Sequence, residues 1–385
     1  MNNQLFDNRA FEVLFYLQDS GYNSWFVGGC VRDALCGKKF TDYDLATIAT
    51  PSEIIKIFKN YEIDKKSLDF GCVRVNNSGL WIEITTLRQD INPDGRHTQV
   101  AFTNDLAKDA LRRDFTINAL YWHGREGSPI IDFFDGQSDL LAKKVRFIGD
   151  AETKVQEDYL RILRFFRFSA IYGCDLDQTA TEACARHQQG LAYLSGNRVW
   201  HEWAKILLQP NSVKVLNKIR ELGIDLTLFG IELNFGEDRG LISLYKGSDP
   251  LLLTNLLLPR LQTQHLAHRF NLNKKERDWL NLAVTLVIDQ DFRELYLEYG
   301  SDTYELVYYW AAKFLTSASD ELNKPFWKVL NPKFTLTGKD LLKLGCLPGP
   351  NVGIYLKSTH DWWVKNDFIP NYEECLRYAC SLFKC

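Results

Sequence analysis

Two aspartates separated by one residue follow a glycine-containing turn near the start of the chain. The turn is Phe26-Val-Gly-Gly-Cys-Val-Arg-Asp33, and the aspartates are Asp42 and Asp44. In an extended segment alternate side chains point to the same face, so both carboxylates are expected to converge. Two hard oxygen ligands of this kind favour Mg²⁺, which assists phosphoryl and nucleotidyl transfer. The spacing therefore predicts a magnesium site formed by Asp42 and Asp44.

The turn itself has the features of a phosphate-binding segment. Gly28 and Gly29 let the backbone turn tightly and approach a ligand closely. Residues 31–35 are predicted to begin a helix, whose free N–H groups attract phosphate, and Arg32 adds a guanidinium. A Gly-Gly pair by itself is usually a simple turn, and an Asp-x-Asp pair is usually a solvated loop. Their order and spacing in one segment make the combination more specific.

The composition sets broad limits on the class of protein. The chain has 385 residues, enough for two to four domains of roughly 100–200 residues each. Nine cysteines are scattered without a Cys-x-x-Cys pair, which argues against a zinc site and a disulfide framework. We expect a cytoplasmic protein with no signal peptide and no membrane contact. The net charge of −3 does not indicate nucleic-acid binding, so any basic surface for RNA must be local.

Several elements are expected to position the turn and the aspartates. Apolar residues at helical spacing predict a helix over 8–19, and a buried strand is predicted to end at Val27. Ser52 is expected to cap a helix that runs to about Phe58.

A hairpin and a loop are predicted next. The strands are 70–75 and 80–87, joined by a turn at 76–79. Glu83 lies in the middle of the second strand, where it is either an exposed strand residue or a third active-site carboxylate. Residues 88–105 lack periodicity and predict a long loop.

Two arginine-containing segments follow. Leu111-Arg-Arg-Asp-Phe-Thr-Ile-Asn-Ala-Leu120 offers two guanidinium groups and a carboxylate ahead of a predicted apolar helix, and a strand is predicted over 145–148. A helix is predicted over 153–172, with a buried apolar stripe. A polar stripe runs beside it at every third residue, formed by Asp158, Arg161, Arg164 and Arg167. A solvated face with i,i+3 ion pairs is the alternative interpretation of that stripe.

The rest of the chain is predicted to be almost wholly helical. Ser195 is a plausible cap for a helix to Leu208, and 179–191 is predicted as one helix. Further amphipathic helices are predicted over 211–223, 241–247, 250–258, 274–290, 292–299 and 302–317.

These motifs together resemble the nucleotidyltransferase superfamily, in the branch that holds the class II tRNA nucleotidyltransferases and the bacterial poly(A) polymerases. The resemblance rests on the turn with its Asp-x-Asp, on Arg-Arg-Asp-Phe-Thr-x-Asn-Ala at 112–119, and on Glu-Asp-x-Leu-Arg-x-Leu-Arg-x-x-Arg-Phe at 157–168. Residues 336–353 resemble the tail of bacterial tRNA nucleotidyltransferases. Residues 70–75 are closer to the tRNA branch than to the Gly-Arg-Arg-Phe stretch of poly(A) polymerases.

The resemblance implies a fold and a domain order. The class is α+β, with a nucleotidyltransferase-type mixed-sheet head over residues 1–150. A helical neck over 151–210, a helical body over 211–325 and a helical, tRNA-binding tail over 326–385 follow. The loop at 88–105 is implied to be flexible and to help switch the nucleotide during addition.

The implied activity is template-independent addition of C, C and A to the 3′ end of tRNA, from CTP and ATP with Mg²⁺, releasing pyrophosphate. An enzyme that adds only the A, or a poly(A) polymerase, is the alternative within the superfamily. A non-catalytic RNA-binding protein is the alternative from another class, and retention of Asp42 and Asp44 argues against it. The sequence does not indicate the oligomeric state.

The resemblance also implies roles for single residues. The residues around the incoming nucleotide and its phosphates are Gly28, Gly29, Arg32, Arg113, Arg164 and Arg167. Asp158 and Arg161 are implied to read the base. The chemistry is consistent, because cytosine and adenine present an amino donor to Asp158 and a ring-nitrogen acceptor to Arg161. Guanine and uracil present the reverse pattern, and each polar group left unpaired costs about 1–3 kcal/mol.

Overall fold

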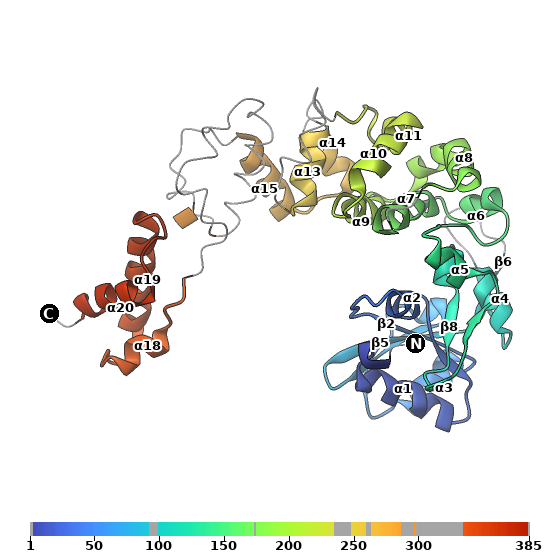
Figure 1. Cartoon of the computed structure of the whole chain (residues 1–385), viewed down its shortest axis with the longest axis horizontal. Helices are drawn as coiled ribbons and strands as arrows, with labels where there is room; N and C mark the ends of the chain where they lie inside the picture. Colours follow the sequence, from blue (N-terminus) through green and yellow to red (C-terminus); the bar gives the residue numbers. More distant parts are fainter. Residues whose placement is uncertain are drawn as a thin grey trace. The chain divides into compact units, whose positions relative to one another are not determined.

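The computed structural model describes residues 3–91, 99–172, 175–234, 248–258, 263–285, 296–297, 300 and 334–383. The chain divides into two compact units, Met1–Glu232 and Leu233–Cys385, which are described separately (Figure 1). The first unit combines a mixed sheet with helices, and the described part of the second unit is helical. The α+β class predicted from the sequence is confirmed.

The first unit is built on a seven-stranded sheet with the order β3-β4-β5-β2-β1-β8-β9. The strands are β1 (Ser24–Val27), β2 (Tyr43–Thr47), β3 (Glu62–Asp64), β4 (Cys72–Asn77), β5 (Leu80–Thr86), β8 (Leu120–Trp122) and β9 (Ile130–Asp132). Only β2 and β5 pair in parallel, with Asp44 opposite Glu83, and the other neighbours are antiparallel. The predicted strand before the glycine turn, the strand containing Asp44 and the hairpin are therefore confirmed.

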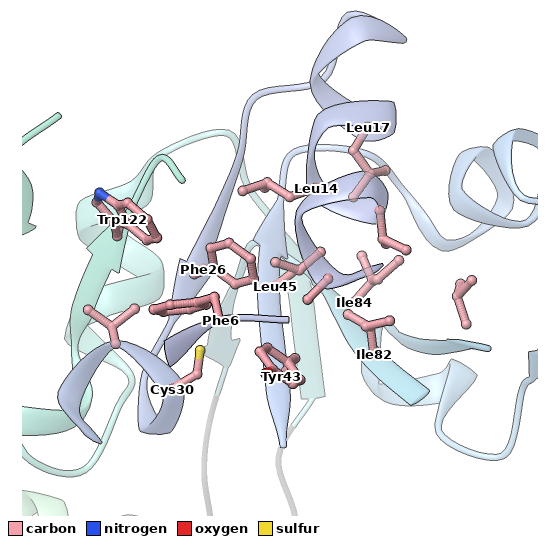
Figure 2. Close-up of a cluster of buried hydrophobic side chains, with 14 of the residues drawn as sticks. Phe6, Leu14, Leu17, Phe26, Cys30, Tyr43, Leu45, Ile82, Ile84 and Trp122 are labelled. Carbon is pink, nitrogen blue, oxygen red and sulfur yellow. The ribbon is translucent and has the colours of Figure 1, made fainter. Parts of the chain in front are cut away.

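An apolar core fixes one face of this sheet to helix α1 (Asn8–Asp19). Leu14 and Leu17 from the helix pack with Phe26 of β1 and Leu45 of β2, and all four side chains are fully buried (Figure 2). Burying one such side chain stabilises the fold by about 1.5–3 kcal/mol. The core thus gives a rigid support to β1, which ends at the glycine turn, and to β2, which begins at the aspartates.

Helix α3 (Pro51–Ile57) starts differently from the prediction. Its N-cap is Thr50 rather than Ser52, and Glu53 completes a capping box with Thr50. Pro51 occupies the first turn, where its missing N–H costs nothing, so the cap must precede it.

The long loop predicted over 88–105 is wrong in part. β6 (Arg88–Ile91) and β7 (Gln99–Phe102) form an antiparallel pair of their own. Each strand is short and β6 carries polar residues, so no hydrophobic alternation marks them in the sequence. Residues 92–98, at the centre of the predicted loop, lie outside the described residues.

The apolar helix predicted after the two arginines is also wrong. Helix α4 (Leu106–Leu111) ends before them, and a 3-10 turn (Thr116–Asn118) leads into β8. The Asp114 carboxylate accepts hydrogen bonds from Phe115 N at 2.8 Å and from Asn118 Nδ2 at 3.0 Å, which favours the turn over a helix. The strand predicted over 145–148 is reduced to a single bridge, between Phe115 and Phe147.

Helices complete the first unit. They are α2 (Gly29–Leu35), α5 (Gly136–Leu141), α6 (Ala151–Glu157), α7 (Leu160–Tyr172), α8 (Gln178–His187), α9 (Gly196–Leu207), α10 (Ser212–Glu221) and α11 (Ile224–Phe229). The helix predicted over 153–172 is split, because Asp158 adopts an extended conformation between α6 and α7. The helix predicted over 179–191 ends at His187 and continues as a 3-10 helix. Ser195 is the N-cap residue of α9, but its side chain makes no capping hydrogen bond.

The second unit contains two groups of described helices. The first is α13 (Pro250–Leu257), α14 (Thr263–Phe270) and α15 (Lys274–Thr285), and the second is α18 (Gly338–Lys343), α19 (Pro350–Lys365) and α20 (Tyr372–Ser381). Trp363 and Val364 of α19 pack with Leu341 and Ala379 in the core of the second group. The helices predicted over 241–247 and 302–317, and most of the one over 292–299, lie outside the described residues. No helix in the described parts is long and apolar enough to cross a membrane.

Candidate active site

A cavity of about 790 Å³ in the first unit brings together every predicted site residue except Glu83. The predicted residues that line it are Gly28, Gly29, Arg32, Asp42, Asp44, Arg113, Asp158, Arg161, Arg164 and Arg167. They come from residues 28–44, which span the glycine turn, α2 and the start of β2, from the segment after α4, and from α7 with the residues preceding it. Three segments that are far apart in sequence therefore meet at one place, as the motifs require.

Asp42 and Asp44 both face this cavity. Asp44 is half-buried in β2, and Asp42 is exposed just before the strand. Burial raises the pKa of Asp44 to about 6, with further increases from Glu83 and Asp42 and an opposing effect from Arg113. A half-buried carboxylate beside other carboxylates gains from a cation, so this donor set fits a hard divalent metal ion.

Asp42 and Asp44 are the two carboxylates of the cavity that would hold the metal ion. Within the described ranges, no group of three or more His, Cys, Asp or Glu side chains is arranged to hold a metal. A site formed by Asp42 and Asp44 would thus leave coordination positions for substrate oxygens and water, as is usual for Mg²⁺.

Glu83 is not brought into the cavity. It lies on β5 directly opposite Asp44, and its side chain is exposed. Its charge nevertheless raises the pKa of Asp44, after burial as the main cause. Glu83 acts on the site through the electrostatic field rather than as a lining residue.

The glycine turn places its backbone close to two arginines. Gly28 has a φ of +71°, which glycine adopts without strain. Arg32, on α2, is buried, and its Nη1 donates to Asn118 Oδ1 at 2.5 Å. Its Nε donates to Asp33 Oδ1 at 2.9 Å, and its guanidinium lies 5.0 Å from the centre of the Phe168 ring. The cation is therefore held in one orientation beside the turn.

Replacing Gly28 with alanine tests the need for this turn. We expect Gly28→Ala to lower the free energy of unfolding by at least about 1–2 kcal/mol, because alanine disfavours positive φ and Gly28 combines it with a ψ of −121°. The new Cβ would also lie 3.4 Å from Arg113 Nη1, at the cavity wall, so the KM for the nucleotide expected from the sequence should rise.

The matched control is Gly37→Ala, at a φ of +66° with no atom within 4 Å of the added Cβ. Gly37 lies outside the cavity lining. Urea unfolding should show a loss of stability for both variants, and only Gly28→Ala should change the KM. Equal KM values for the two variants would contradict a role of the turn in nucleotide binding.

Carboxylates from other elements hold Arg164 and Arg167 on α7. Arg164 Nε donates to Asp114 Oδ2 at 2.7 Å. Arg167 Nε lies 3.1 Å from Glu202 Oε2 on α9, and its guanidinium lies 4.4 Å from the centre of the Phe168 ring. The two cations are thus fixed at the cavity wall by partners outside their own helix.

The Asp114–Arg164 pair predicts an acid dependence of stability. Burial opposes ionisation of Asp114, yet Arg164 and the hydrogen bonds from Asn118, Arg164 and Phe115 N lower its pKa to about 2. A lowered folded-state pKa stabilises the fold above the ordinary value of 3.8, and this contribution disappears as the pH falls toward 2. We expect a loss on the order of 2 kcal/mol over this range. Urea unfolding at a series of pH values should show a shallower slope for Asp114→Asn, and an unchanged slope would contradict the assignment.

Asp158 lies at the break between α6 and α7, with its carboxylate held at both oxygens. Oδ1 accepts a hydrogen bond from Leu160 N at 3.1 Å, and Oδ2 accepts one from Arg198 Nη2 on α9 at 2.8 Å. The side chain is partly exposed to the cavity. Its orientation is therefore fixed while it can still meet a ligand.

Arg161 is held more tightly than Asp158. Its Nη1 donates to Lys154 O at 2.9 Å and contacts the Glu157 carboxylate, and its Nη2 donates to Arg112 O at 3.0 Å. These partners come from α6 and from the segment after α4. The guanidinium is thereby fixed at the wall of the cavity that Asp158 also lines.

Several cavity residues were not identified from the sequence as site residues. They include Lys39, Phe70, Arg112 and Arg198. Arg112 adjoins Arg113 in one motif, so adjacency could have indicated it. Arg198 approaches Asp158 only because α9 packs on α7, and no local sequence signal reveals a partner 40 residues away.

Comparisons with known proteins agree with this geometry. The poly A polymerase head domain family matches residues 24–146. The chain is 33% identical to the mitochondrial CCA tRNA nucleotidyltransferase 1 of Danio rerio, covering 93% of this chain and 87% of that protein. It is 38% identical to the CCA-adding enzyme of Oceanobacillus iheyensis over 56% of this chain and 54% of that protein.

A solved structure has the same fold over almost the whole length. The crystal structure of the Bacillus stearothermophilus CCA-adding enzyme in complex with CTP has a TM-score of 0.68 and 26% sequence identity. The match covers 98% of this chain and 97% of that one. With a relative at 33% identity over most of both chains, this protein belongs to the family of CCA tRNA nucleotidyltransferases.

Proposed function

We propose that this protein adds C, C and A to the 3′ end of tRNA, using CTP and ATP and releasing pyrophosphate, without a nucleic-acid template. The observation that carries the proposal is the convergence of the paired aspartates, the glycine turn and the Asp158–Arg161 pair in one cavity. Relatives that match over most of the chain carry the name of this activity.

The reaction joins the 3′ hydroxyl oxygen of the tRNA to the α-phosphorus of the nucleotide, while the bond to the pyrophosphate breaks. Enzymes of this family use a divalent metal ion, and we propose Mg²⁺ held by Asp42 and Asp44. When bound there, such an ion would supply positive charge to the α-phosphate and would lower the pKa of the attacking hydroxyl. In the proposal, Gly28 and Gly29 bring backbone N–H groups to the triphosphate, and Arg32 faces it.

The remaining arginines supply positive charge around the nucleotide. We assign Arg113, Arg164 and Arg167 to this role, because all three line the cavity and each is oriented by a carboxylate. A guanidinium oriented before the substrate binds needs no reorganisation when charge builds up in the transition state. The leaving pyrophosphate would be neutralised by these same groups.

Asp158 and Arg161 would select the base. The carboxylate accepts from the amino group of cytosine or adenine, and the guanidinium donates to the adjacent ring nitrogen. Because both side chains are held by several hydrogen bonds, they cannot easily turn to accept guanine or uracil. One rigid pair would therefore admit C and A and reject G and U.

We also propose the domain order expected from the sequence. It consists of a head at 1–150, a neck at 151–210, a body at 211–325 and a tRNA-binding tail at 326–385. We also predict a cytoplasmic location, although three of the relatives are named as mitochondrial proteins.

A gel assay separates this function from its alternatives. Purified protein and Mg²⁺ are mixed with tRNA transcripts that end before CCA, after C or after CC, and each nucleotide is supplied singly and together. We expect CTP to extend the first two transcripts and ATP to extend the third. Addition restricted to the CC-ended transcript would indicate an A-only enzyme. Long A tails would indicate a poly(A) polymerase, and no extension would indicate a binding protein.

A further inference from the structure

A buried carboxylate lies behind the two adjacent arginines of the active site. Asp109, on α4, is only 1% exposed and is not among the residues that line the cavity. Its Oδ1 accepts from Arg112 Nε at 2.8 Å, and its Oδ2 accepts from Arg113 Nη2 at 3.1 Å. Spacings of three and four residues bring all three side chains to one side of the helix end. One carboxylate thus orients both guanidinium groups.

Tyr121, from β8, completes this arrangement. Its hydroxyl donates to Asp109 Oδ2 at 2.7 Å and accepts from Arg113 Nε at 3.0 Å. The tyrosine side chain is fully buried, and the Arg113 guanidinium lies 5.2 Å from the centre of its ring. Burial opposes ionisation of Asp109, but Arg113 and Arg112 lower its pKa to about 2, so it is a carboxylate at neutral pH.

The two arginines lead to different parts of the site. Arg113 Nη1 lies 3.5 Å from Asn118 O and beside Gly28 of the glycine turn. The backbone oxygen of Arg112 accepts from Nη2 of Arg161, at 3.0 Å. Asp109 is therefore connected both to the proposed triphosphate site and to the proposed base-reading pair.

We propose that Asp109, assisted by the Tyr121 hydroxyl, is a positioning residue for both arginines. It sets Arg113 against the glycine turn, and it holds Arg112, whose backbone oxygen accepts a hydrogen bond from Arg161. The proposal rests on the proposed function, because it assigns these arginines to an incoming CTP or ATP. Asp109 lies outside the cavity lining, so it would not touch a nucleotide bound there. Its loss should weaken binding of both nucleotides, because the triphosphate is common to them.

The test compares Asp109→Asn with a matched buried carboxylate. Asp139 is 5% exposed, accepts from Thr116 Oγ1 at 2.6 Å and from Arg146 Nε at 2.8 Å, and lies outside the cavity lining. We expect Asp109→Asn to raise the Kd for CTP and for ATP roughly 10- to 100-fold, with kcat falling less than KM rises. Asp139→Asn should lose stability in urea without changing either Kd. Equal Kd values for the two variants would overturn the proposal.

A double-mutant cycle shows whether Asp109 acts through Arg113. If it does, the loss of CTP affinity in Asp109→Asn combined with Arg113→Ala should be smaller than the sum of the two single losses. Any loss beyond that of Arg113→Ala alone measures the effect that passes through Arg112. Additive losses would overturn the proposal. If Asp109→Asn does not fold, Tyr121→Phe replaces it in the same cycle, because this change removes only the hydroxyl. Equilibrium binding of CTP in Mg²⁺ needs no tRNA, so a failure of CCA addition by the native protein is distinguishable from a failure of this inference.

Discussion

Asp44→Ala should reduce nucleotide addition at least about 1,000-fold while leaving the fold intact, because charge on the α-phosphate would lose its metal partner. The variant should unfold at an equal or higher urea concentration than the native protein. In the native protein burial raises the pKa of the Asp44 carboxyl to about 6, so its ionisation at neutral pH lowers the stability of the fold. Alanine removes this cost. Single-turnover addition of CTP to a tRNA transcript, with urea unfolding of the same preparation, measures both effects.

The control for this change is Asp64→Asn, on β3 of the same sheet and outside the cavity lining. It removes an acidic charge near the surface, where Asp64 Oδ2 lies 3.6 Å from Lys66 Nζ. We expect it to keep full activity. If Asp44→Ala remained active, the assignment of the metal site would be wrong. If Asp44→Ala lost activity only because it unfolded, Asp44 would have a structural role instead.

Asp158→Asn should reduce the preference for CTP over UTP by about 10- to 100-fold. An asparagine amide can donate to the uracil carbonyl as well as accept, whereas the carboxylate only accepts. Two hydrogen-bond donors, Leu160 N and Arg198 Nη2, hold the native Asp158 carboxylate in the orientation that would reject uracil. The measurement is kcat/KM for each nucleotide with the transcript that ends before CCA.

The matched control for specificity is Asp175→Asn, at an exposed aspartate paired with Lys214 at 2.7 Å outside the cavity lining. It should leave the CTP preference unchanged. An equal fall of kcat/KM for all four nucleotides in Asp158→Asn would contradict base reading, since it would indicate a general loss of binding or folding.

The parts of this site that could be predicted depend on local sequence. The strand before Gly28 is buried and apolar, and the alternation around Asp44 fixes the face of its carboxylate, so both followed from spacing. The arginine stripe on α7 was visible from its period, as was the hairpin from its turn residues. The α+β class followed from these elements together.

The parts that were not predicted depend on side-chain hydrogen bonds and strand pairing, some of them local and some between distant residues. The Asp114 side chain binds Phe115 N and Asn118, and these bonds replace the expected helix with a tight turn. β6 and β7 pair with each other across residues that show no alternation. The extended conformation at Asp158 splits one expected helix into two, and it is this break that directs the carboxylate toward Arg198. The β6–β7 pairing and the contact of Asp158 with Arg198 have no signal within one turn or one strand of the sequence. The turn at Asp114 does have a local signal, because an aspartate side chain can bond to nearby backbone in place of a helix.

The most direct test of the proposed function is the mass of the product formed when all four nucleotides are present together. A tRNA transcript that ends before CCA is incubated with the protein and Mg²⁺, and its 3′ fragment is analysed by mass spectrometry. The proposed function predicts a gain equal to two cytidylate residues and one adenylate residue, with no further growth. A gain of uridylate or guanylate, a run of adenylates, or an unchanged mass would contradict it.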